Sequence, residues 1–79
     1  MAENRIQSRL RTLKAGKIVF NDRRSVVDCT VRNLSRSGAC LQMPSTTGIP
    51  PRFELWLEGA SWTCAIAWRS GTRIGVAFQ

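Results

Sequence analysis

The sequence predicts an all-β protein, a small six-stranded antiparallel β-barrel. From residue 14 onward, apolar and polar residues alternate, which is the period of strands that bury one face. The stretches between the alternating segments are rich in Gly, Pro, Asn, Asp and Ser, the composition of turns. A chain of 79 residues has room for a single domain. Six short strands that each bury one face close most economically into a barrel.

Each expected strand is defined by the apolar residues that share its inner face. In chain order these are Ile18 and Phe20; Val27, Cys29 and Val31; Ala39, Leu41 and Met43; Phe53, Leu55 and Leu57; Trp62, Cys64, Ile66 and Trp68; Ile74, Val76 and Phe78. The links between them read "NDRRS", "NLSRSG", "PSTTGIPP", "EGAS" and "RSGTR", all of turn or loop composition. Trp56 alternates with the apolar residues of its strand and should therefore face outward.

Residues 1–13 do not share this alternation, and we expect them to form a flexible basic arm before a barrel that spans residues 14–79. Residues 1–24 hold seven Lys or Arg and two acids, a net +5 of the total +7. Such a segment attracts phosphate, in the form of nucleic acid, a nucleotide or an anionic membrane surface. The chain stops at Gln79, directly after the sixth expected strand, so we expect no C-terminal helix.

Several classes of function are disfavoured by composition. The chain has no His, three widely spaced Cys and no Cys-x-x-Cys, so we expect neither a metal site nor a cofactor. Without His or a paired arrangement of carboxylates, we do not expect an enzyme. No apolar run approaches about 18 residues and the start lacks a signal-like core, so we expect a cytoplasmic protein with no membrane span.

The loop "RNLSRSGA" combines turn chemistry with groups that can bind a ligand. Asn and Ser side chains bond their own backbone in turns, and Gly38 is expected to supply a positive φ. The same residues suit ligand binding. Asn33 can accept a hydrogen bond from a base N–H, Ser35 is a small donor and acceptor, and Gly38 permits close approach.

The arm contains a second candidate motif, "RIQSR". Arg5 and Arg9 are four residues apart, so they lie on one side of the chain in either an extended strand or a helix. The planar guanidinium fork bonds a phosphate bidentately and fits the O6 and N7 edge of guanine equally well. The pair therefore suits a ligand with two separated acceptor groups.

Together the two motifs resemble the signature of the PilZ domain family. That signature is Arg-x-x-x-Arg followed, about two strands later, by Asp/Asn-x-Ser-x-x-Gly. It matches Arg5, Arg9, Asn33, Ser35 and Gly38, with the strand led by "GKIVF" between the motifs. The ending "CAIAWRSGTRIGVAFQ" is also similar to the last hairpin of the family. The resemblance covers nearly the whole chain.

The resemblance implies a split barrel that senses cyclic di-GMP, the bacterial second messenger. It implies that Arg5 and Arg9 clamp guanine edges and phosphates, while the loop at Asn33, Ser35 and Gly38 holds the other side of the ligand. It also implies a downstream protein partner, in processes such as motility or biofilm formation. Asn33 stands where Asp is commoner, which lowers the expected affinity because a neutral oxygen replaces a charge-assisted acceptor.

Two other functions stay open. A small basic barrel could bind nucleic acid, although Trp56 lies between Glu54 and Glu58, the wrong charge for a base-stacking platform. A PilZ-like adaptor that has lost nucleotide binding could work through protein contacts alone. The presence of Arg5 and Arg9 argues against the adaptor.

Overall fold

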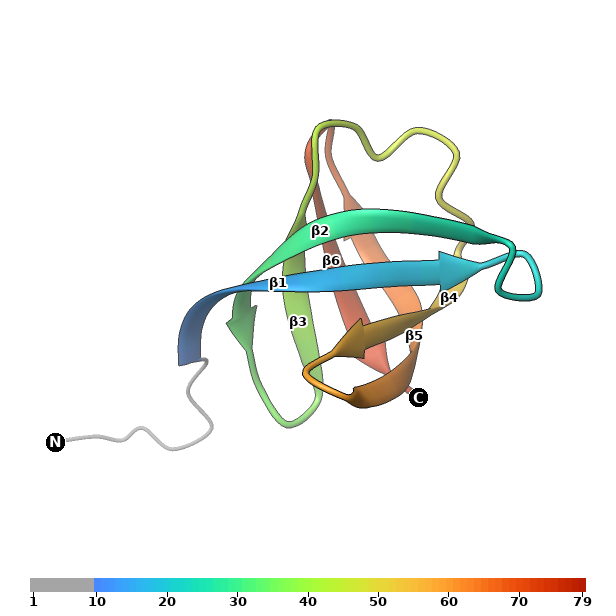
Figure 1. Ribbon diagram of the computed structural model, residues 1–79. Coiled ribbons are helices and arrows are strands. Elements are labelled where there is room, and N and C mark those ends of the chain that lie inside the picture. Colours follow the sequence, from blue (N-terminus) through green and yellow to red (C-terminus); the bar gives the residue numbers. More distant parts are fainter. Residues whose placement is uncertain (1–9) are drawn as a thin grey trace, which may run out of the picture.

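Six antiparallel strands form a closed barrel in the computed structural model, which describes residues 10–79 (Figure 1). The strands are β1 (Leu10–Phe20), β2 (Ser25–Leu34), β3 (Gly38–Gln42), β4 (Arg52–Leu57), β5 (Ala60–Arg69) and β6 (Arg73–Phe78). Their order around the barrel is β1-β2-β3-β6-β5-β4, and pairing of β4 with β1 closes it. The predicted fold class is confirmed. Within residues 10–79 no helix is long and apolar enough to cross a membrane.

The core consists mainly of alternate residues that the sequence pattern identified, and Ile49 joins it from the loop between β3 and β4. Inside the barrel lie Ile18, Cys29, Val31, Ala39, Leu41, Met43, Ile49, Phe53, Leu55, Leu57, Cys64, Ile74 and Val76. Trp62 packs against this cluster and stacks on Phe78, with ring centroids 5.5 Å apart. Trp56 is exposed, as its position between core residues predicted. Trp68 is the exception among the expected core residues, because 46% of its surface is exposed.

The barrel contains three β-bulges, which determine the side chains on its outer surface. One of them explains why Trp68 is exposed. The register shifts between Arg11 and Lys14 in β1, at Arg32 in β2 and at Ala67 in β5. Each bulge inserts one residue, and one extra residue reverses which side chains face inward. After Ala67, Trp68 therefore faces outward. The prediction that Trp68 shares the inner face of its strand is wrong for this reason.

The barrel begins earlier than the sequence predicted. The expected arm ended at residue 13, but β1 starts at Leu10, whose Cα partner is Leu34. The bulge interrupts the alternation of apolar and polar residues in this part of the strand. Leu13 within it has a φ of 48° and is exposed, although it is apolar. Residues 1–9, which include Arg5 and Arg9, lie outside the described residues.

Gly38 is required for a reason other than the one predicted. Its φ is not among the positive values, which are found instead at positions such as Glu58 (51°) and Gly59 (81°) in the two-residue turn between β4 and β5. A Cβ at position 38 would collide with the carbonyl oxygen of Val76 in the neighbouring strand β6. The glycine therefore permits close packing of two strands, and the predicted positive φ is wrong.

Two core thiols should make stability decrease at alkaline pH. Burial, with a smaller contribution from the charge of Asp28, raises the pKa of Cys29 from 9.0 to about 11, and burial raises the pKa of Cys64 equally. Below pH 9 both thiols are neutral in the folded and unfolded states. Between pH 9 and 11 the unfolded state loses protons first, so the free energy of unfolding should fall, by on the order of 1–3 kcal/mol per thiol.

Urea unfolding followed at pH 8, 9, 10 and 11 measures this loss. The Cys29→Ala and Cys64→Ala double variant should show a shallower decline than the parent, because it lacks the two thiols whose pKa values burial raises. Equal slopes for the two proteins would contradict the assignment to the thiols.

Candidate functional site

The three bulges bring five residues of five strands into one row across the barrel. Arg11 is the Cα partner of Asn33, Asn33 of Cys40, Cys40 of Gly75, and Gly75 of Trp68. Figure 1 shows β3 and β6 side by side behind β2, where the middle of this row lies. Bulges re-aim side chains and are frequent beside functional sites. The row is therefore the first candidate for a binding surface.

The surface around the middle of the row is built from small residues, and we call it the shelf. It consists of Gly38, Cys40, Gly75, Ala77 and Ala65. All five lie on β3, β5 or β6. They alternate with core residues such as Leu41, Val76 and Cys64, so they lie on the outer face of the sheet. Gly38, Cys40 and Gly75 are buried, Ala65 is half-buried and Ala77 is exposed, and none of the five carries a long side chain. Asn33 bounds the shelf on the β2 side.

Trp68 bounds the shelf on the β5 side, and its indole ring lies over Gly75. A Cβ at position 75 would collide with indole atoms Nε1 and Cε2, so only glycine leaves room for the ring there. The indole N–H of Trp68 donates to no group among the described residues. By contrast, the N–H of Trp56 donates to Glu54 Oε1 over 2.9 Å.

Arg69 fixes the backbone next to Trp68. Because the bulge reverses the alternation, Arg69 pairs with Ile74 at the end of the barrel. There its guanidinium donates to the carbonyl oxygens of Thr46, over 3.3 Å, and of Ile49. The loop between β3 and β4 thus holds the strand immediately after Trp68, which limits how far the indole can move.

The shelf side of the barrel is cationic. Strands β3, β5 and β6 contain no Asp or Glu. Arg36, Arg52 and Arg73 surround the shelf, are exposed, and take part in none of the ion pairs of residues 10–79. Three carboxylates near β1 and β4 have cationic partners: Asp28 with Lys17 (2.7 Å), Glu58 with Lys14 (3.0 Å) and Glu54 with Arg23 (4.0 Å). Exposed arginines without an ion pair within residues 10–79 thus flank the shelf, where they can attract an anion, and Arg24 is a further such arginine in the turn between β1 and β2.

The loop between β2 and β3 ends at the shelf, and hydrogen bonds join two of the three predicted loop residues, Ser35 and Gly38. The backbone N–H of Ser35 donates to Gly38 O over 2.8 Å, and Gly38 N–H donates to Ser35 Oγ over 3.2 Å. Ser70 and Arg73 make the same two bonds, over 2.8 and 3.2 Å, in the turn between β5 and β6. Ser35 thus shapes a turn of a kind that the barrel uses twice, and its contact with a ligand stays a prediction.

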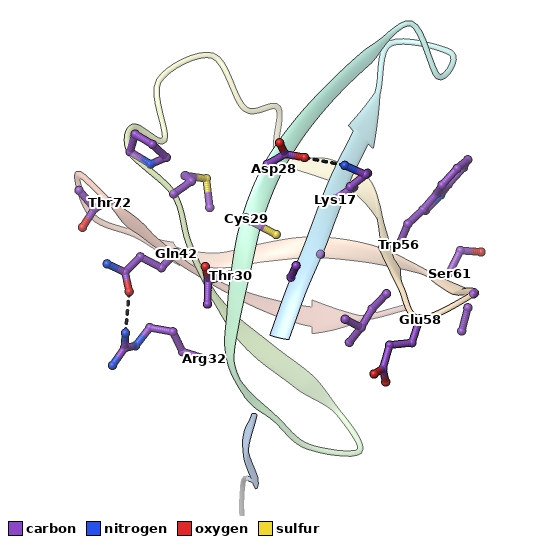
Figure 2. Close-up of a pocket in the computed structure, with 17 residues that line it drawn as sticks. Lys17, Asp28, Cys29, Thr30, Arg32, Gln42, Trp56, Glu58, Ser61 and Thr72 are labelled. Atoms are coloured by element: carbon purple, nitrogen blue, oxygen red, sulfur yellow. Dashed lines mark hydrogen bonds and ion pairs between the residues drawn. The ribbon is translucent and has the colours of Figure 1, made fainter. Parts of the chain in front are cut away.

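A cavity lies elsewhere on the barrel. It has a volume of about 1280 Å³ and is lined by β1, β2, the end of β3 and the turn between β4 and β5 (Figure 2). Each charged side chain in its lining has a partner: Lys17 pairs with Asp28 over 2.7 Å and Arg32 donates to the neutral amide of Gln42 over 2.7 Å (Figure 2). Glu58 accepts from Lys14, which lies outside the lining, over 3.0 Å. Asn33, Ser35 and Gly38 are absent from its lining. We therefore place the candidate site on the shelf.

Sequence reasoning missed Cys40, Gly75 and Trp68 as members of the site. The alternation assigned Trp68 to the core, and a one-residue bulge leaves no mark in the pattern. Among residues 10–79, no group of three or more His, Cys, Asp or Glu could hold a metal ion. No protein-family model matches the chain, and no curated protein matches it.

Proposed function

We propose that the shelf binds cyclic di-GMP and that the protein is a non-enzymatic sensor of this messenger. The observation that carries the proposal is the row that sets Asn33 beside the small residues of the shelf, with exposed arginines around them. Asn33 belongs to the loop motif through which the sequence resembles PilZ domains, and the row was not part of that resemblance. The register of the strands and the loop motif both favour the surface around Asn33.

The chemistry of the shelf suits a cyclic dinucleotide. Such a ligand presents two flat bases and two phosphates, so it needs a surface without protruding side chains and with cations nearby. The small residues of the shelf supply the first, and Arg36, Arg52 and Arg73 supply the second. The amide oxygen of Asn33 can accept from a guanine N–H, which reads the base rather than the charge.

Chain connectivity allows the arm to reach the same place. Strand β1 begins at Leu10, opposite Leu34 at the end of β2. Consecutive Cα atoms are about 3.8 Å apart, so the backbone of Arg9 is attached directly beside the row. Arg5 is within roughly 18 Å of Leu10 even in an extended chain. Both arginines are thus close enough to close over a ligand on the shelf.

The Asn33→Asp variant should bind cyclic di-GMP threefold to tenfold more tightly than the parent, a gain of about 0.7–1.4 kcal/mol. A carboxylate adds a second acceptor and charge assistance to a guanine N–H, and a charge-assisted bond is roughly twice as strong as a neutral one. Repulsion from ligand phosphates beyond about 8 Å is largely screened at physiological salt. Isothermal calorimetry measures the difference, with Asn33→Ala expected to weaken binding. If Asp weakens binding as much as Ala does, Asn33 does not read guanine.

Trp68 supports a second candidate function, the binding of single-stranded nucleic acid. An exposed aromatic ring among arginines is the usual platform for a base. An extended strand usually needs several such platforms, and Trp68 is the one aromatic residue among the residues 10–79 that form or border the shelf. A short oligonucleotide that binds with a steep dependence on salt, while cyclic di-GMP does not bind, would favour this candidate.

A further inference from the structure

We propose that Trp68 is the stacking platform for one purine base of the bound nucleotide and thereby helps to determine ligand specificity. The inference rests on the proposed function and adds a residue that neither sequence motif contains. Three features of the indole ring carry it: its place in the row, its exposure and the glycine beneath it.

The place of the ring matches the length of a dinucleotide. The indole lies over Gly75 in β6, and Asn33 lies two strands away, in β2. With strands about 4.8 Å apart, the ring and Asn33 are separated by roughly 10 Å. A ligand that stacks on Trp68 and also reaches Asn33 must therefore be longer than a single base, as a dinucleotide is.

The ring is available for stacking and is held in place. Trp68 is 46% exposed although one side of the ring covers Gly75, so a large part of the indole faces solvent. Burying that surface under a base removes apolar area from water and adds the attraction between two flat π-systems. The bonds of Arg69 to the loop fix the adjacent backbone, so little ordering of this residue is needed when the ligand binds.

Gly75 offers a second, independent way to test the platform by mutation. Any side chain there would lift the indole away from the sheet, because the space of a Cβ is already occupied by the ring. Gly75→Ala should therefore move the platform without removing it. Trp56, which is 41% exposed on a different face of the barrel, provides a matched control for the loss of an exposed tryptophan.

The first experiment compares affinities for cyclic di-GMP by calorimetry. Trp68→Leu should weaken binding about fivefold to 150-fold, the range expected for loss of one base–aromatic stack. Trp68→Phe keeps a flat ring and should bind within about threefold of the parent, whereas Gly75→Ala should bind less tightly than Trp68→Phe. Trp56→Leu should bind like the parent. If Trp68→Leu also binds like the parent, the platform is refuted and the proposed function stands.

The second experiment reports on the ring directly. In a protein carrying Trp56→Phe and Trp62→Phe, with thermal unfolding as the check on folding, Trp68 is the remaining fluorophore. Saturable quenching by cyclic di-GMP supports the platform. Quenching by cyclic di-AMP or a ten-nucleotide single strand, but not by cyclic di-GMP, keeps the platform and refutes the proposed function. No change with any of the three ligands refutes the platform.

Discussion

Replacing both Arg5 and Arg9 with alanine should weaken the binding of cyclic di-GMP by about two to four orders of magnitude. Each guanidinium is expected to make charge-assisted bonds to a guanine edge or a phosphate, worth about 1.5–3 kcal/mol per residue. The free energy of unfolding should change by less than about 0.5 kcal/mol, because both residues precede the barrel, which begins at Leu10. Calorimetry and urea unfolding measure the two quantities on the same samples.

A matched control separates specific contacts from general attraction. The Arg23→Ala and Arg24→Ala double variant removes the same charge from the turn between β1 and β2, outside the shelf. It lowers the long-range attraction of an anion equally but leaves the arm intact, so its affinity should fall by less than about tenfold. Similar losses for the two double variants would mean that the arm contributes charge alone.

Gly38→Ala should be the most destabilising single substitution at the site, with a loss of about 3 kcal/mol or failure to fold. The new Cβ would collide with the carbonyl oxygen of Val76, and backbone cannot move aside as a side chain can. Strands β3 and β6 would have to separate locally, which costs as much as severe overpacking of a core. Chemical unfolding by urea measures the loss.

Gly71→Ala provides the comparison. A Cβ at position 71 meets nothing within 4 Å and its φ is not positive, so the change should cost less than about 0.5 kcal/mol. Equal losses at the two positions would contradict the account of Gly38. If Gly38→Ala folds normally yet loses cyclic di-GMP binding, Gly38 serves the ligand rather than the packing of β3 against β6.

The alternation of apolar residues was sufficient to predict the barrel. Val31, Leu41 and Ile74 are core residues at the positions that the period of two assigned to them. The number of strands and the positions of the turns followed from the same pattern, because a strand with one buried face must alternate apolar and polar residues. The arm boundary at residue 13 could not be predicted, since the bulge near Leu13 interrupts the period where the strand continues to Leu10.

The site was predictable only where a motif identified it. Asn33 was found through the loop motif, although simple alternation from Val31 would have turned it inward. Trp68 was assigned to the core, because a bulge at Ala67 is decided by pairing with β6 and not by local composition. The shelf itself required the register of several strands, since Cys40, Ala65 and Gly75 come from three different strands.

The central claim is that the protein recognises cyclic di-GMP, and calorimetric titration of the full chain tests it most directly. Cyclic di-AMP and GTP are the controls, at equal concentration and physiological salt. Adenine carries an amino donor where guanine has the O6 acceptor, so an arginine fork cannot bond its edge bidentately. We expect saturable binding of cyclic di-GMP and at least about tenfold weaker binding of both controls. Absence of saturable binding by cyclic di-GMP, or equal affinity for all three nucleotides, would contradict the account.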